Sequence, residues 1–304
     1  MFLKNQYASF VLFCIILLTT QCISETEIDL PVESDRLVFV SHPEPGFPIR
    51  GSLGISSSVT SNNYLLPTDL LPVFSVLEGN RSFDVLRQFP GSTGDQPFWE
   101  GAANARKDST YTITIETPGY PIVTAQTTIP KPSVPKITVD MNNFVPVISG
   151  DKVIKRIPLT ISLGDISQTD SFFVFNVQFV KFNNVDSDYR QSDAHFLALG
   201  STLAYLHPMP DNSLLIEKNF WNTTADTTLK IDIVVDYMLA YENPYKLIID
   251  WRTVSKEYYF YYLSLSRQGN VSLPFSDPDI LYNNIKGGYG TFSGFSRTYR
   301  EIML

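Results

Sequence analysis

The sequence predicts a mainly β protein with two domains, and three observations support this. Aromatic residues make up 13% of the chain, with 21 Phe and 16 Tyr, and these side chains favour strands. Short apolar or alternating runs recur between turn residues, whereas a single segment has a convincing helical pattern. A length of 304 residues suits two domains of ordinary size. We therefore expect an N-terminal β-sandwich of immunoglobulin or transthyretin type, followed by a larger antiparallel β domain with one helix.

The N-terminal end has the pattern of a lipoprotein signal peptide. Lys4 supplies a basic start, and the apolar run at residues 10–18 is too short to span a bilayer. Cys22 follows this region directly, which resembles a bacterial lipobox, in which the cysteine thiol is lipidated and the leader is removed. We expect residues 1–21 to be this leader and Cys22 to carry the lipid; the alternative is ordinary cleavage of the leader or its retention as an anchor.

Residues 22–34 are expected to form an acidic tether. Acidic residues just behind the lipidated cysteine resemble the signal that sends such lipoproteins to the cell surface; the alternative is a plain solvated tether, with the protein on either face of the outer membrane. Loss of Lys4 leaves 22 basic and 31 acidic side chains, a net charge of −9. A chain this acidic has no electrostatic reason to bind nucleic acid or anionic lipid. Because Cys14 leaves with the leader, the mature chain cannot form an internal disulfide.

The predicted sandwich domain covers residues 35–130. Residues 110–116 alternate strictly between apolar residues and polar ones, as in a strand with one buried face. Two strand-like runs flank the dipeptide Gly79-Asn80, which favours a hairpin with a type II′ turn. Residues 49–59 alternate only weakly and are rich in Ser and Gly, which suggests an edge strand.

The C-terminal domain is expected to follow a stiff linker. Prolines are concentrated at residues 131–136 and just before them, and such a segment is extended and semi-rigid. The second domain then covers residues 137–304. Within it, residues 172–182 are apolar enough for a central strand, whereas residues 183–193 are expected to form a polar loop.

One helix is predicted, at residues 255–268. Ser255 is a suitable N-cap, and Glu257 is favourable near the positive end of the helix dipole. Arg267 and Gly269 suit the C-terminal end. Apolar and tyrosine side chains recur at helical spacing, so we expect this helix to pack against a sheet.

Residues 273–296 combine prolines, glycines and bulky apolar side chains. Prolines fix φ, and glycines allow a positive φ or a close backbone approach. We expect one of Gly287, Gly288 and Gly290 to have a positive φ, and Phe292 to be buried beneath the loop. A packed loop that closes a domain is the main interpretation, and a ligand-facing loop is the alternative.

The same segment carries a family resemblance. The residues concerned are Pro274, Phe275, Pro278, Asn284, Gly287, Gly288, Gly290 and Phe292. Together they resemble the C-terminal signature of the family catalogued as domain of unknown function 4249. Its members are lipoproteins of Bacteroidota, often encoded beside TonB-dependent outer-membrane receptors. The resemblance implies a location in the outer membrane and a TonB-dependent receptor as partner, but no reaction.

No catalytic or metal-binding constellation is recognisable in the sequence. The histidines are His42, His195 and His207, and none has another His or a Cys at the spacing that a zinc site needs. Ser293 lies in a motif similar to a nucleophile elbow, but Thr291 replaces its first glycine. A Ser-His-Asp triad could still assemble in space around His195. We expect no metal and no cofactor.

These observations favour a non-enzymatic outer-membrane lipoprotein. We expect it to act as an accessory or ligand-binding partner of a TonB-dependent transporter, with a ligand that the sequence does not identify. One alternative is a hydrolase at the cell surface or in the periplasm that acts on glycan or peptide. The other is a structural protein of the cell envelope.

Overall fold

The computed structural model describes most of the chain beyond the predicted tether. The described residues are 35–56, 66, 67, 70–90, 97–140, 145–149, 152–162, 172–183, 187–193, 195–198, 206–209, 211–217, 228–238, 242–268 and 280–303. Asp35–Leu304 form one compact unit. Among the described residues there is one helix, and no helix is long and apolar enough to cross a membrane.

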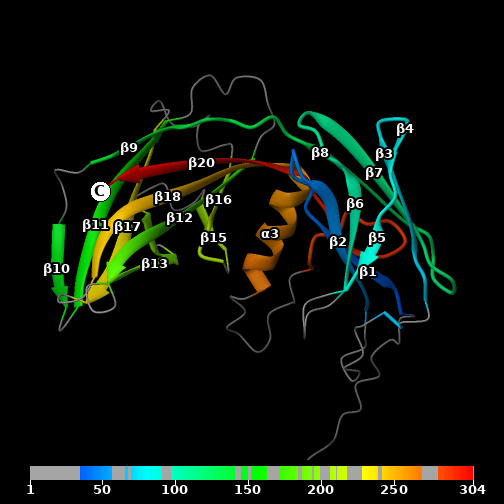
Figure 1. Ribbon diagram of the computed structural model, residues 1–304, viewed down its shortest axis with the longest axis horizontal. Coiled ribbons are helices and arrows are strands. Elements are labelled where there is room, and N and C mark those ends of the chain that lie inside the picture. Colours follow the sequence, from blue (N-terminus) through cyan, green and yellow to red (C-terminus); the bar gives the residue numbers. More distant parts are fainter. Residues whose placement is uncertain are drawn as a thin grey trace, which may run out of the picture. The chain divides into compact units, whose positions relative to one another are not determined.

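The protein is mainly β, which confirms the predicted fold class. The described strands form four sheets, here named A to D, and one helix, α3, accompanies them. Every pairing of described strands is antiparallel except that between β1 and β19. Figure 1 labels most of these strands together with α3. Apart from β19, the strands of sheets A and B lie within residues 37–129, here called the front half, and those of sheets C and D lie within residues 136–303, the rear half.

Sheets A and B form the predicted sandwich. Sheet A has the order β19-β1-β2-β6-β5, and sheet B has the order β4-β3-β7-β8. Their bounds are β1 Leu37–Ser41, β2 Pro48–Ile55, β3 Val73–Glu78, β4 Arg81–Asp84, β5 Arg87–Phe89, β6 Phe98–Asn104, β7 Ser109–Glu116, β8 Val123–Ile129 and β19 Tyr289–Phe292. The expectation of an edge strand at residues 49–59 is wrong, because β2 lies between β1 and β6 and pairs along both edges.

The inner faces of sheets A and B enclose one hydrophobic core. On β7, Tyr111, Ile113 and Ile115 have no exposed surface, as the alternation of this strand predicts. Phe39 of β1 and Phe74 of β3 meet between the sheets with their ring centroids 5.9 Å apart. Apolar residues at every second position therefore pack the two sheets face to face.

The hairpin between β3 and β4 turns at Gly79-Asn80, as the sequence predicts. Gly79 has a φ of 59°, whereas Asn80 is not among the described residues with positive φ. A type II′ turn needs a positive φ at its first central residue alone, so glycine stands where the turn requires it.

Sheets C and D form the rear half. Sheet C has the order β10-β11-β17-β14 with β9 also paired to β11, and sheet D has the order β15-β16-β12-β18-β20 with β13 also paired to β12. Their bounds are β9 Lys136–Val139, β10 Val145–Ser149, β11 Lys152–Ser162, β12 Phe172–Asn183, β13 Asp188–Asp193, β14 His195–Ala198, β15 Leu206–Pro208, β16 Leu214–Ile216, β17 Thr228–Met238, β18 Glu242–Val254 and β20 Phe295–Met303. The prediction of a loop at residues 183–193 is wrong for residues 188–193. These residues form β13, whose backbone pairs with β12 in spite of its polar sequence.

The central strand of sheet D is β12, between β16 and β18, as its apolar sequence predicts. Phe173, Phe175 and Val177 belong to the core that sheets C and D share. Val174 points to the other face, where it packs with residues of α3. A strand that is buried on both faces gives a continuous apolar run rather than an alternating one.

Helix α3 (Lys256–Gln268) confirms the predicted helix and packs on sheet D. Ser255 is its N-cap, because its Oγ accepts a hydrogen bond from the Tyr258 backbone N–H at 3.3 Å. Tyr258, Tyr259 and Leu263 form the buried face of the helix. Replacing such a cap by alanine costs about 1 kcal/mol, but the aromatic packing holds the helix in place.

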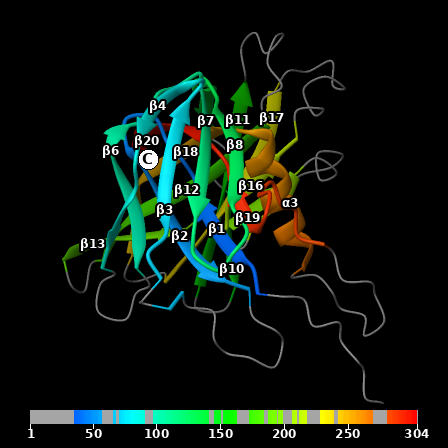
Figure 2. The same cartoon turned by 90° about the vertical axis from the view of Figure 1, so that its right-hand side faces the viewer.

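The C-terminal segment joins the two halves. β19 pairs in parallel with β1 and becomes the edge of sheet A (Figure 2). β20 pairs with β18 in sheet D (Figure 1). The sequence places this whole segment in the domain of residues 137–304, but the structure adds β19 to the front sandwich. The physical reason is that β19 satisfies the backbone groups on the free edge of β1. A boundary at residues 131–136 stays a prediction.

The predicted linker is anchored along sheet D. The Trp251 indole Nε1–H donates to Ser133 Oγ at 2.9 Å, and the Ser133 backbone N–H donates to Thr253 Oγ1 at 3.0 Å. Ser296 Oγ donates to the carbonyl of Pro130. The proline-rich segment is thus tied to both β18 and β20.

Candidate functional site

The closing loop at residues 280–288 is held by two asparagine side chains. Asn283 Nδ2 donates to the carbonyl of Gly288 at 3.1 Å, and its Oδ1 accepts from the Ile285 N–H at 3.0 Å. Asn284 pairs with both backbone groups of Phe292, since Nδ2 donates to the carbonyl at 2.8 Å and Oδ1 accepts from the N–H at 3.0 Å. Each amide therefore acts as a substitute backbone partner, which an aspartate or leucine could not do.

The glycines of the loop permit close contact with neighbouring backbone. Gly287 and Gly290 have positive φ values, of 78° and 115°. A positive φ was predicted for one of these two glycines or Gly288. A Cβ at Gly287 would meet the carbonyl of Ile122, and one at Gly290 would meet the carbonyl of Phe39. Gly288 has no positive φ, but a Cβ there would meet the carbonyl of Leu37 on β1. The loop can lie flat on β1 and β8 only without side chains at these positions.

Phe292, the last residue of β19 after the closing loop, lies inside the front core. Its side chain has no exposed surface, and its ring centroid lies 6.3 Å from that of Phe39. The resemblance residues that the structure describes therefore close the front sandwich; they are Asn284, Gly287, Gly288, Gly290 and Phe292. Cys22, Pro274, Phe275 and Pro278 lie outside the described residues.

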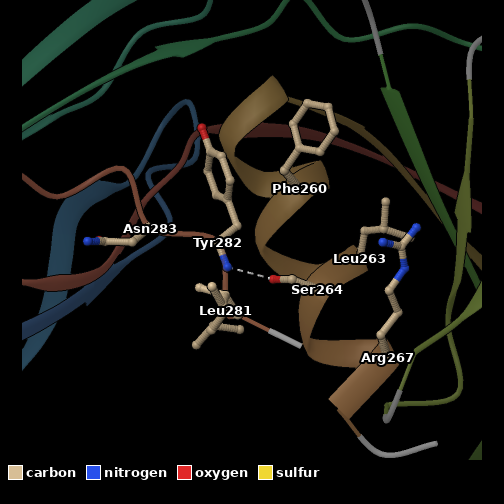
Figure 3. Close-up of a pocket in the computed structure, with 8 residues that line it drawn as sticks. Phe260, Leu263, Ser264, Arg267, Leu281, Tyr282 and Asn283 are labelled. Carbon is tan, nitrogen blue, oxygen red and sulfur yellow. Dashed lines mark hydrogen bonds between the residues drawn. The ribbon is translucent and has the colours of Figure 1, made fainter. Parts of the chain in front are cut away.

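A cleft of about 490 Å³ lies between this loop and α3 (Figure 3). Its lining residues are Phe260, Leu263, Ser264, Arg267, Ile280, Leu281, Tyr282 and Asn283. The Tyr282 backbone N–H donates to Ser264 Oγ at 2.9 Å, which fixes the loop to the helix. The rings of Tyr282 and Phe260 lie 5.7 Å apart and give the cleft an aromatic wall.

A second cleft, of about 390 Å³, shares Tyr282 with the first. Its lining residues are Thr112, Thr124, Ala125, Gln126, Glu257, Tyr282, Asn284 and Lys286. The floor comes from β7 and β8, and the walls come from the closing loop and the start of α3. Burial raises the pKa of Tyr282, and the Glu257 carboxylate raises it further, so the Tyr282 hydroxyl stays protonated at neutral pH. This polar cleft, the name we keep for it, is lined mainly by hydroxyl, amide and charged groups.

A chain of hydrogen bonds lies between β19 and α3. Ser293 Oγ lies 2.9 Å from His42 Nδ1, and His42 Nε2 lies 3.1 Å from the Tyr262 hydroxyl. Thr291 Oγ1 donates to Ser293 Oγ at 3.1 Å. The Ser293 and Tyr262 hydroxyls can each donate or accept, so either neutral tautomer of His42 has a partner for both ring nitrogens.

This arrangement disfavours a charged imidazole. Burial lowers the pKa of His42 to about 4, a hydrogen bond with the Ser293 backbone opposes this, and the nearby Arg252 guanidinium lowers the pKa further. His42 is therefore held neutral at the junction of the front sandwich and α3.

Replacing His42 by glutamine is expected to change how stability depends on pH. The folded pKa of His42 lies below its ordinary value of 6.5, so the unfolded chain binds a proton first. The contribution of His42 is thus complete above about pH 6.5 and is lost as the pH falls towards 4, by at most about 1.4 kcal/mol per pH unit. The measurement is the free energy of unfolding in urea for both proteins at pH 7.5, 6 and 5. Parallel curves for the two proteins would show that His42 is not held neutral.

Close by, Asp250 lies in a buried set of charges. The Arg252 guanidinium donates to Asp250 Oδ2 from two nitrogens, at 2.9 and 2.6 Å. Arg297 Nε lies 3.4 Å from Asp250 Oδ1 and 3.8 Å from Glu44 Oε1. Burial raises the pKa of Glu44, and Arg297 partly offsets this rise. Because Glu44 follows β1 while Asp250, Arg252 and Arg297 lie in sheet D, these ion pairs connect the two halves.

The Ser293–His42 contact has the composition of a nucleophile and its base, but not their surroundings. Ser293 has no exposed surface, and the second imidazole nitrogen of His42 meets a tyrosine rather than a carboxylate. His195 lies on β14 with its side chain outside the described part. Within the described residues, no three His, Cys, Asp or Glu side chains are grouped so that they could hold a metal ion.

Sequence reasoning did not find the polar cleft. Gln126, Glu257 and Lys286 come from a strand, a helix and a loop, and nothing in their local sequence marks them as neighbours. Tyr282 is recognisable from sequence only as one of several bulky side chains near the glycines. The alternation of β8 does place Gln126 on the outer face of sheet B, which is the one signal that was present.

Comparison with known proteins gives a family and no individual relative. No curated protein matches this chain. One family profile, described as a domain of unknown function, DUF4249, matches residues 24–301, which is most of the chain. The match includes every described strand but the last two residues of β20, together with α3 and the closing loop. The chain therefore belongs to the DUF4249 family, as the residues of the closing segment indicate.

Proposed function

We propose that this protein is a lipid-anchored outer-membrane protein that binds a ligand as the partner of a TonB-dependent transporter. The main support is the position of Cys22. It follows the apolar leader directly, and the family match begins at residue 24. The region that the family profile matches thus starts two residues after the proposed lipidated cysteine, and residues 1–21 lie outside it.

A binding role, rather than an enzymatic one, fits the described clefts. Two clefts of about 490 and 390 Å³ flank Tyr282, and both are within the size range of ligand sites, roughly 300–1,000 Å³. The Ser293–His42 pair is enclosed, so substrate would have no access to the serine. The protein would hold its ligand near the mouth of the transporter and leave chemistry to other proteins.

Replacing Cys22 by alanine is expected to abolish lipidation and leave the leader attached, because the thiol is the acceptor of the lipid. Labelling of cells with a radioactive fatty acid, together with the gel mobility of the protein, measures both effects. Cys14→Ala is the matched control, since Cys14 lies inside the apolar run and should have no role. Normal processing and labelling of the Cys22 variant would exclude the lipoprotein assignment.

Affinity purification from native outer membranes under mild cross-linking is expected to recover a TonB-dependent receptor with the tagged protein. The mature charge of −9 gives the body no attraction to anionic lipid, so contact with another protein has to orient it. An untagged strain provides the background. Recovery of the lipoprotein without any receptor would exclude the partnership, even if the lipid anchor is present.

A further inference from the structure

We infer that the polar cleft binds a neutral, hydroxyl-rich ligand, namely an oligosaccharide. The inference rests on the binding role proposed above and adds the chemical class of the ligand. It depends on the side chains that line the cleft, on the balance of their charges and on the ring of Tyr282.

The cleft offers both donors and acceptors of hydrogen bonds. Thr112 and Thr124 carry hydroxyls that can act either way, and the Gln126 amide supplies one carbonyl and one NH₂ group. Among the described residues, no hydrogen bond or ion pair engages the side chains of Gln126, Glu257 or Lys286. A sugar hydroxyl also both donates and accepts, so it can pair with any of these groups.

The charges of the cleft cancel. Glu257 is its carboxylate and Lys286 is its ammonium group, so neither an anion nor a cation is favoured as ligand. An acidic ligand would meet Glu257, and a cationic ligand would meet Lys286. A neutral ligand can instead use both, since hydrogen bonds to charged groups are stronger than those between neutral groups.

The ring of Tyr282 supplies the apolar part of the site. A sugar ring differs from other neutral, hydroxyl-rich compounds because it has a face of C–H groups. This face can lie flat on an aromatic ring. Tyr282 lines both clefts, and Phe260 continues the aromatic wall in the larger one (Figure 3). An extended chain of sugars would pass Tyr282 from one cleft into the other, whereas a single small polyol would not use the second cleft.

The site also has a rigid frame. Asn284 ties the loop to Phe292, and the backbone of Lys286 exchanges two hydrogen bonds with Thr124, at 3.0 and 2.8 Å. The Tyr282 backbone is bound to Ser264 of α3. The closing loop is therefore fixed to both β8 and α3, which orders the cleft before a ligand arrives.

Isothermal titration calorimetry on the purified full chain tests the inference, in a detergent without sugar head groups. The probes are cellohexaose, maltohexaose, xylohexaose and N-acetylchitohexaose, with hexagalacturonate as the acidic comparison. At least one neutral probe should bind, and hexagalacturonate should bind less tightly than that probe. Tyr282→Ala should then raise the Kd about tenfold and Gln126→Ala about fivefold, whereas Tyr282→Phe should change it little.

Thr128→Ala is the matched control. Thr128 lies on the same face of β8 as Gln126, two residues further on, but does not line the cleft. Its variant should bind like the unchanged protein. Gln126 is exposed, so its replacement should leave the fold intact even if Tyr282→Ala lowers the melting temperature.

The inference is overturned if no neutral probe binds, if hexagalacturonate binds most tightly, or if Gln126→Ala and Tyr282→Ala leave the Kd of a binding probe unchanged. These outcomes are separate from those that concern the proposed function. A correctly lipidated protein that recovers a receptor but binds no probe would remove the sugar assignment alone. If the protein binds a sugar probe but is not lipidated and recovers no receptor, only the proposed location and partner are excluded.

Discussion

Replacing Gly290 by valine is expected to lower the free energy of unfolding by about 3 kcal/mol or more, the upper part of the range for single substitutions. Two effects add at this position. The φ of 115° is unfavourable for any residue with a Cβ, and the new Cβ would collide with the carbonyl of Phe39. Relief of the collision would require β19 to separate from β1 and Phe292 to leave the core.

Gly119→Val is the matched control for this substitution. Gly119 also has a positive φ, of 83°, but a Cβ there meets nothing within 4 Å. The Gly119→Val variant should therefore lose only the free energy that the unfavourable φ costs, about 1–2 kcal/mol. Urea unfolding followed by tryptophan fluorescence measures both variants. Equal losses at the two positions would show that the close approach of β19 and β1 contributes nothing.

Asp250→Ala is expected to destabilise the protein by about 3–5 kcal/mol, as breaking a buried ion pair by removal of one partner usually does. Asp250 is only 8% exposed and lies between Arg252 and Arg297. Its loss would leave two cations close together in a poorly hydrated place. The Arg252 contact to the Tyr258 hydroxyl, at 3.3 Å, would not replace the carboxylate.

The exposed ion pair between the same two strands is the control. Lys246 of β18 binds Glu301 of β20 at 2.9 Å, and the Glu301 side chain is 59% exposed. Glu301→Ala should therefore cost less than about 1 kcal/mol, and added salt should reduce this further. Thermal and urea unfolding of both variants, at low and high salt, separates the two cases. A similar small loss for Asp250→Ala would mean that water already reaches the buried charges.

Both predictions concern the same architectural feature, the passage of the C-terminal segment from sheet A to sheet D. Gly290 lies before the passage and Arg297 lies after it. Ser293 and Gly294 form the passage itself, where the Gly294 N–H donates to Thr127 Oγ1 of β8 at 2.8 Å. The glycines, the buried charges and the His42 chain thus keep the front and rear halves in one unit.

Local patterns were sufficient for the elements whose causes are local. The alternation of β7 predicts its buried face, because side chains in a strand point to opposite sides by geometry alone. The dipeptide Gly79-Asn80 predicts the hairpin, and Ser255 predicts the start of α3, because a turn and a cap depend on neighbouring residues. The glycines near residue 290 indicate an unusual backbone, although not what the backbone approaches.

The sequence by itself determined the β class, the single helix in the described part, the family and a closing segment that needs glycine. The tertiary structure alone decided that β19 joins β1 in parallel, that His42 meets a serine 251 residues away, and that β13 is a strand. It alone assembled Gln126, Glu257, Tyr282 and Lys286 into a cleft. The physical reason is that the spacing of residues along the chain determines which face of an element they occupy. Pairing between distant segments depends instead on which strand edges and which charges still lack partners once the sheets have packed.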